Sequence, residues 1–151
     1  MMTDQPDRQA LLVMDFQAGV VERFGDDHRL LGRVRSAIDA AHAAGLLVVY
    51  VRVAFRPGFP EVSPANRSFS AIAAIGTKFD ESAPGTQIHS MLASQSEDVI
   101  VTKRRVGAFS GSDLEVLLRS RRVGTLALSG IATSGVVLST LSLDPPIEPL
   151  I

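Results

Sequence analysis

The sequence predicts an α/β fold, in which a mostly parallel sheet is covered by helices on both faces. Short continuous apolar runs alternate along the chain with segments whose apolar residues recur at helical spacing. A strand, a helix and a second strand follow one another within the first 55 residues, which is the pattern of a βαβ unit. The chain has 151 residues, enough for one domain with its own core.

The first βαβ unit is expected between Ala10 and Phe55. The run ALLVMDF, Ala10–Phe16, is apolar apart from Asp15 and fits a strand that is buried on both faces. Residues 28–45 show helical periodicity, and Gly45 is the expected stop of that helix. Residues 46–55, LLVVYVRVAF, are the second expected strand.

The next segment is irregular. Residues 56–85 are rich in Pro, Gly and Ser, so we expect a loop with one short helix near residues 68–75. A second short helix is expected in TQIHSML, residues 86–92.

The second half of the chain resumes the alternation. Asp98–Lys103 is the third expected strand, and the helix in residues 110–121 is expected to begin with a capping box between Ser112 and Glu115. VGTLALSG, residues 123–130, is the fourth strand. A further helix is expected from residue 134, ending before the prolines at 145 and 146.

Three of the predicted strands end in groups that can take part in chemistry. Asp15 follows the first strand, Lys103 ends the third, and the fourth runs into the turn at residues 130–135. Because ligands bind at the carboxyl ends of parallel strands, these groups are expected on one rim. Each also has a simpler interpretation: Asp15 as a turn former, Lys103 as a solvated strand end, and the turn as a helix cap.

Composition excludes several function classes. The net charge of −1 argues against nucleic-acid and membrane-surface partners. The chain has no cysteine, and its three histidines lack the spacing of a metal site, so neither a metal nor a cofactor is expected. The turn GIATSG lacks a dinucleotide or phosphate-loop fingerprint. Without a signal-peptide pattern or a long apolar span, a cytoplasmic location is expected.

Four segments, taken together, resemble the isochorismatase-like hydrolase superfamily, which includes cysteine hydrolases. They are LLVMDFQAG, VYVRVAFRPGFPEV, VTKRRVGAFSGSDLEVLLR and LALSGIATSGVVLST, and the resemblance covers about residues 10–140. It implies a Rossmann-like three-layer α/β/α sandwich. It also implies a catalytic set of Asp15, Lys103 and Val136, the last at the position of the family cysteine. The implied substrate contacts are Phe16, Gln17, Phe55, Arg56 and Ala132.

Val136 has no reactive atom, so a thioester route is closed. The isochorismatases proper cleave a vinyl ether with the Asp as the proton-transferring group, and Asp15 with Lys103 would suffice for such chemistry. We therefore expect a hydrolase that acts on a small carboxylate-bearing molecule. The alternative is a catalytically inactive relative that serves as a binding or oligomer-forming module.

We treat residues 1–151 as one isochorismatase-like domain whose residues 141–151 form a divergent tail. The resemblance implies that the final strand and helices of the family are missing from this truncated chain. A missing strand would leave an unpaired sheet edge and exposed apolar surface, so we expect a homo-oligomer.

Overall fold

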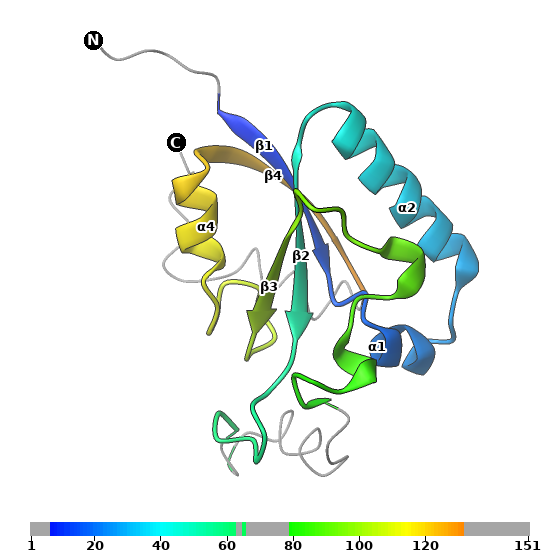
Figure 1. Cartoon of the computed structure of the whole chain (residues 1–151), viewed down its shortest axis with the longest axis vertical. Coiled ribbons are helices and arrows are strands. Elements are labelled where there is room, and N and C mark those ends of the chain that lie inside the picture. The colour runs from blue at the N-terminus through cyan, green and yellow to red at the C-terminus, as the bar shows by residue number, and fades with distance from the viewer. Residues whose placement is uncertain (1–6, 63–64, 66–78, 132–151) are drawn as a thin grey trace.

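A computed structural model places four parallel strands at the centre of the molecule (Figure 1). The structure describes residues 7–62, 65 and 79–131. The strands are β1 (Arg8–Met14), β2 (Leu47–Val53), β3 (Val99–Lys103) and β4 (Val123–Gly130), in the order β3-β2-β1-β4. The α/β fold with a parallel sheet is thus confirmed. The helices expected at 68–75 and from 134 lie outside the described residues.

The central strand is β1, which pairs with β2 along one edge and with β4 along the other. Residues Ala10–Met14 are all buried, because each has a neighbouring strand on both sides and packed side chains on both faces. The continuous apolar run therefore indicated the most enclosed strand of the sheet. β1 begins two residues earlier than expected and ends at Met14, which leaves Asp15 in the turn that follows.

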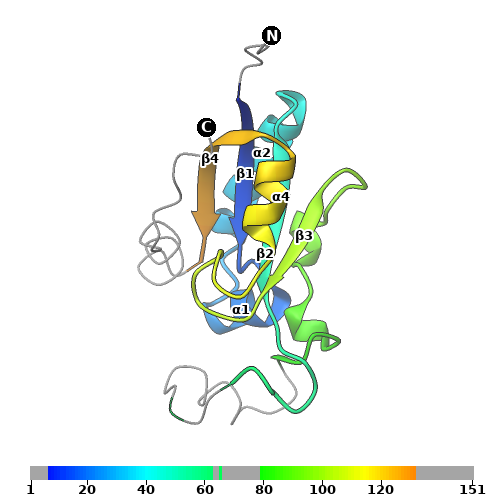
Figure 2. The same ribbon diagram turned by 90° about the vertical axis from the view of Figure 1, so that its left-hand side faces the viewer.

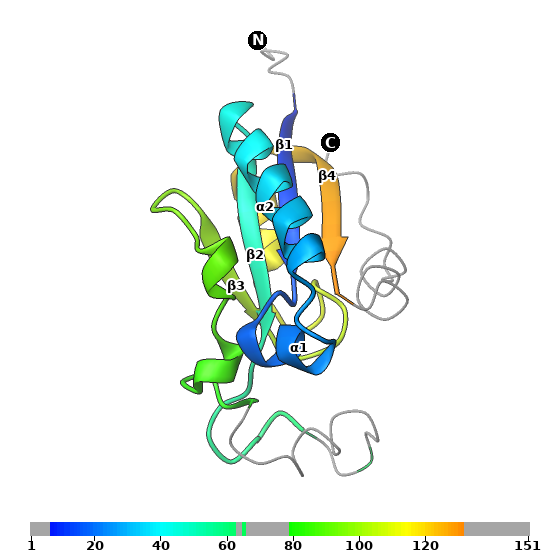
Figure 3. The ribbon, with the colours of Figure 1, turned by 90° about the vertical axis from the view of Figure 1, so that its right-hand side faces the viewer.

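Helix α2 (His28–Ala43) covers one face of the sheet (Figure 3). The Asp27 carboxylate caps it by accepting hydrogen bonds from the backbone N–H groups of Arg29 and Leu30. Gly45 follows its last turn with a φ of 73°, a conformation that favours glycine, so the expected stop is confirmed. The inward side chains of α2 pack on residues of β1 and β2, namely Leu11, Val13, Val48 and Tyr50. These inward side chains are Leu31, Val34, Ile38 and Ala41.

Helix α4 (Leu114–Ser120) covers the opposite face, so the sheet lies between two helical layers (Figure 2). Its buried residues Leu114 and Leu118 pack on the side chains of β1, β2 and β3 that point away from α2. The capping box expected between Ser112 and Glu115 was wrong. Asp113 is the N-cap residue; the Ser112 hydroxyl donates to the Ala108 carbonyl and accepts from the Leu114 N–H at 3.3 Å.

The segment before β3 also differs from expectation. In place of one short helix over 86–92, the structure has two single 3-10 turns, η2 (Pro84–Thr86) and η3 (Ser90–Leu92). Residues between them are held extended because Gln17 forms an antiparallel bridge with Ile88. The sequence analysis also missed the short helix α1 (Ala18–Arg23), which directly follows this bridge.

The strand order places a topological switch point at the carboxyl end of β1. The chain moves outward from β1 to β2 and β3, and then returns to place β4 on the other side of β1. Open α/β sheets bind ligands where the order reverses in this way. Asp15 lies directly at that point. Among the described residues, no helix has the length and apolar character needed to cross a membrane.

The packing of α4 predicts unequal effects of two truncations on the same helix. Leu118→Ala should lower the free energy of unfolding by about 2–5 kcal/mol, because Leu118 is fully buried and its removal leaves a cavity. Val116→Ala is the matched control: Val116 is 70% exposed, so its loss should change stability by no more than about 0.5 kcal/mol. Urea denaturation measures both; equal losses would contradict the described packing.

Candidate functional site

Asp15 is the first residue after β1 and lies at the switch point. Its φ of 63° is in the left-handed region, a conformation that costs a non-glycine residue about 1–2 kcal/mol. Its backbone N–H nevertheless donates to the Val51 carbonyl of β2 at 2.9 Å, so the turn stays attached to the sheet. The residue is only 6% exposed. A strained, buried carboxyl at a strand end is typical of a functional position.

Lys103 is the last residue of β3, and its side chain meets Asp15. The ammonium Nζ lies 3.1 Å from each carboxylate oxygen of Asp15 and donates a hydrogen bond to Oδ2. It also donates to the Val106 carbonyl at 2.6 Å. Because β2 separates β1 from β3, the two side chains together bridge about two strand spacings, or roughly 9–10 Å. The predicted meeting of Asp15 and Lys103 is confirmed.

Burial is the main cause of the pKa shifts of both groups in this pair. Removal from water raises the pKa of the Asp15 carboxyl above its ordinary value of 3.8, and the nearby Lys103 charge lowers it by less. Burial likewise lowers the pKa of Lys103, against the opposing effect of Asp15. Both shifts favour the uncharged forms of the two groups. The pair therefore holds a carboxyl that keeps its proton to a higher pH than an exposed aspartate does.

The two oxygens of this carboxyl differ in their hydrogen bonds. Asp15 Oδ1 is buried and accepts no hydrogen bond from any of the residues that the structure describes. A buried polar atom without a partner is costly in a folded protein and is rare. Oδ1 nevertheless lies within ion-pair distance of Lys103 Nζ, at 3.1 Å, so the lysine faces both oxygens of the carboxyl.

Gln17 fixes the backbone beside the pair. Its side-chain NH₂ donates to the carbonyls of Val53 and Thr86, at 2.8 and 3.0 Å, and its Oε1 accepts from the Val53 N–H at 2.8 Å. The side chain is fully buried. Its expected contact with substrate stays a prediction, and in this structure the amide ties the turn after β1 to the last residues of β2 and η2.

The remaining predicted substrate contacts fall into two groups. Phe16 and Phe55 are buried, and the Phe55 ring lies 5.7 Å from that of Phe59. Arg56 has a side chain that is 61% exposed, with its guanidinium donating to Glu61 at 2.6 Å. Ala132 and Val136 lie outside the described residues.

The sequence matches the model of the isochorismatase domain over residues 9–142. The chain belongs to the isochorismatase family. It is 30% identical over 133 residues to the uncharacterized isochorismatase family protein YwoC of Bacillus subtilis, covering 88% of this chain and 68% of YwoC. It is 29% identical over 153 residues to the ureidoacrylate amidohydrolase RutB of Stutzerimonas stutzeri, covering 87% of this chain and 62% of that protein. The chain thus spans under two thirds of RutB's length.

Solved structures agree with this family assignment. A cysteine hydrolase from Pseudomonas syringae pv. phaseolicola superposes with a TM-score of 0.79 at 25% identity, covering 92% of this chain and 70% of that one. An isochorismatase family protein from Burkholderia thailandensis gives a TM-score of 0.71 at 29% identity, covering 87% and 68%. The N-carbamoylsarcosine amidase of Thermoplasma acidophilum, at 23% identity and a TM-score of 0.70 over 89% and 74%, shows the shared fold.

A second charged group, Arg104, lies directly after Lys103 and was expected from the sequence only as a further anion-binding cation. The Arg104 guanidinium donates to the Ala54 carbonyl and to the Glu81 carboxylate, the latter at 3.0 Å. Its Nε lies 3.8 Å from Glu61. These contacts join the loop after β3 to the loop after β2, and no local pattern could reveal them because the acidic partners lie more than 20 residues away. Among the described residues, no three acidic or histidine side chains gather as metal ligands.

The charge balance at Asp15 predicts a pH-dependent effect of Lys103→Met. Removing the lysine removes the interaction that lowers the pKa of Asp15, so that pKa should rise further. A carboxyl whose pKa is higher in the folded than in the unfolded state binds more protons when folded. The free energy of unfolding should therefore fall as the pH rises from the ordinary value of 3.8 to the folded-state pKa, by up to about 1.4 kcal/mol per pH unit.

Chemical denaturation at a series of pH values measures this slope. The window in which stability falls should extend to higher pH in Lys103→Met than in the unchanged chain. The control is the double variant Asp15→Asn/Lys103→Met, in which this contribution should vanish. A slope that persists in the double variant would show that another group causes it.

Proposed function

We propose that this isochorismatase-family chain hydrolyses a small carboxylate-bearing molecule by acid–base chemistry at Asp15, without a thiol nucleophile. The observation that carries the proposal is the buried Asp15–Lys103 pair at the switch point, with the pKa of Asp15 raised by burial. A general acid works best when its pKa lies near the working pH, and the shift is in that direction.

Asp15 supplies the proton in the proposed reaction. For a vinyl ether, the protonated carboxyl transfers its proton to the terminal alkene carbon, which makes the carbon bonded to oxygen electrophilic. Water adds to that carbon and gives a proton back to the Asp15 carboxylate. The resulting hemiketal then breaks its carbon–oxygen bond, and the products are a ketone and an alcohol. The carboxyl ends the cycle protonated, as it began.

Lys103 acts on this step through Asp15. Its Nζ is fully buried and holds the carboxylate oxygen Oδ2 and the Val106 carbonyl, which fixes the orientation of the Asp15 carboxyl. When Asp15 has given up its proton, the ammonium charge stabilises the carboxylate that forms. We assign Lys103 this positioning and electrostatic role in the proposed reaction.

The proposed substrate carries a carboxylate that Arg56 binds. Its guanidinium is exposed at the loop after β2, where it can exchange the Glu61 contact for a ligand carboxylate. The rings of Phe16 and Phe55 are buried and supply apolar surface near this binding site. The proposal includes no metal and no cofactor, and a homo-oligomer as the assembled form.

The alternative function is a catalytically inactive relative that binds a ligand or another copy of the chain. One observation favours it specifically. The chain contains no cysteine, whereas the similar Pseudomonas syringae structure is described as a cysteine hydrolase. A chain without a nucleophilic cysteine, and without another catalytic route, would keep the fold and the ion pair but would turn over no substrate.

A substrate screen with isochorismate and a set of simple primary amides and ureides separates the two functions. Chromatography with mass detection follows the products. We expect turnover of the vinyl ether, and Asp15→Asn should lower kcat by about 10²–10⁴-fold because the amide cannot deliver the proton. The matched control is Asp39→Asn, the same change at an exposed carboxylate that pairs with Arg35 on α2.

Two results would contradict the acid–base proposal. Turnover that survives Asp15→Asn would remove Asp15 from the reaction. A folded chain that turns over none of the compounds would support the inactive relative instead. A melting curve of each variant shows whether a loss of activity reflects a loss of folding.

A further inference from the structure

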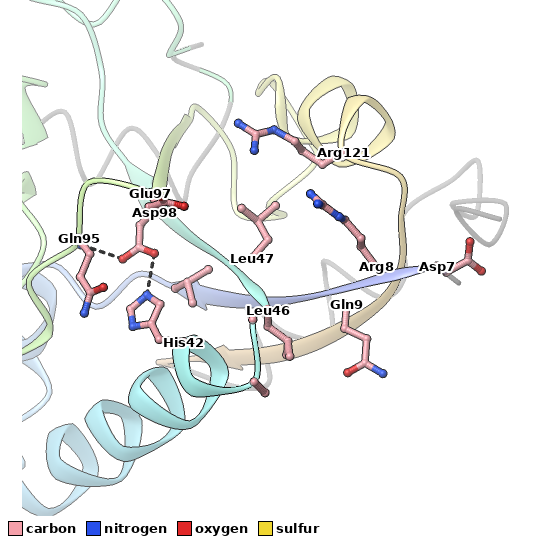
Figure 4. A pocket seen from close by; sticks show the side chains of 13 residues that line it. Asp7, Arg8, Gln9, His42, Leu46, Leu47, Gln95, Glu97, Asp98 and Arg121 are labelled. Atoms are coloured by element: carbon pink, nitrogen blue, oxygen red, sulfur yellow. Dashed lines mark hydrogen bonds and ion pairs between the residues drawn. The ribbon is translucent and has the colours of Figure 1, made fainter. Parts of the chain in front are cut away.

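A cavity of about 540 Å³ lies at the amino ends of β1 and β2, the end of the sheet opposite to Asp15 (Figure 4). Its volume is within the roughly 300–1,000 Å³ range of sites that bind small molecules. Arg8 at its wall and Asp15 are seven residues apart on one strand, which corresponds to roughly 23 Å. The cavity is therefore separate from the proposed catalytic site.

Two cationic side chains line this cavity from different elements. Arg8 comes from the start of β1, and Arg121 directly follows α4. Figure 4 shows the Arg121 guanidinium pointing toward the side where Glu97 lies, and the Arg8 guanidinium pointing toward Leu47 and Arg121. Within the described ranges, neither guanidinium forms an ion pair with a carboxylate, unlike Arg119 of α4, which pairs with Glu115. Two such guanidinium groups at one cavity are a site for an oxyanion.

The acidic groups of the cavity leave room for such an anion. The Asp98 side chain is 2% exposed, and its carboxylate already binds His42 Nε2 at 2.7 Å and the Gln95 backbone N–H at 2.8 Å. Asp7 points away from the two arginines (Figure 4). Glu97 is the remaining acidic residue at the rim, and it opposes anion binding.

Two leucines add apolar surface to the otherwise mostly polar lining of the cavity. Leu46 and Leu47 line it where the chain enters β2, and both are partly exposed to it. A ligand with an apolar part beside its charged group would therefore cover more of these leucines than a bare ion does.

We propose that this cavity binds a small molecule that carries a carboxylate or phosphate group, with the oxyanion held between Arg8 and Arg121 and the apolar part on Leu46 and Leu47. The site does not depend on the proposed hydrolytic function. A charged metabolite could then bind at the amino ends of the strands while the proposed reaction takes place at their carboxyl ends.

Isothermal titration calorimetry of the full chain tests the site with four probes: inorganic phosphate, phenyl phosphate, acetate and benzoate, all at constant ionic strength. We expect saturable binding, tighter for each aromatic probe than for its simple counterpart because the ring can cover Leu46 and Leu47. The phosphate and carboxylate arms show which oxyanion the site prefers. Asp15→Asn should leave binding unchanged, since Asp15 is at the far end of β1.

Variants assign the binding to the named residues. Arg8→Gln and Arg121→Gln should each weaken binding by about tenfold or more. Glu97→Gln should strengthen it, because a repelling charge is removed. The matched control is Arg119→Gln, which removes an arginine of α4 that does not line the cavity and should leave affinity unchanged.

The proposal fails if none of the four probes binds saturably. It also fails if Arg119→Gln weakens binding as much as Arg121→Gln does, since the effect would then be one of overall charge. Melting curves without ligand check that the exposed arginine replacements leave the fold intact.

Discussion

The Asp15–Lys103 ion pair joins the carboxyl ends of β1 and β3 across β2, and both groups are almost fully buried. Burying two charges removes them from water, and their mutual attraction rarely repays that cost in full. The opposite pKa shifts of the two groups reflect this balance. The aspartate is also held in a strained backbone conformation. The pair is therefore better explained by the chemistry that it permits than by the stability that it adds.

The surrounding structure keeps this pair in place. The sheet supplies the geometry, because its parallel strands bring both residues to one rim at the switch point. Gln17, in the turn after β1, hydrogen-bonds to Val53 and Thr86. Arg104 joins the loops after β2 and β3 through its hydrogen bonds to Ala54 and Glu81. These polar contacts stiffen segments that have little regular structure. The rim is therefore held by side chains as much as by strands.

Much of this arrangement could be predicted from the sequence. Apolar runs identified the strands. Because ligands bind at the carboxyl ends of parallel strands, the sequence also predicted that Asp15 and Lys103 lie on the same rim of the sheet. The prediction was weaker where distant contacts decide the local structure. Pairing of Gln17 with Ile88 divides the expected helix at 86–92, and the bond from Ser112 to Ala108 replaces the expected capping box. No periodicity encodes such contacts, since they depend on what the folded chain brings near.

The carboxyl pKa of Asp15 tests the central claim most directly. It can be measured by ¹³C NMR of aspartate-labelled protein, with the Asp15 signal assigned as the one lost in Asp15→Asn. If burial outweighs the lysine charge, this pKa lies above the ordinary value of 3.8. A pKa at or below 3.8 would mean that the ion pair simply stabilises a carboxylate, and the proposed proton donor would be lost.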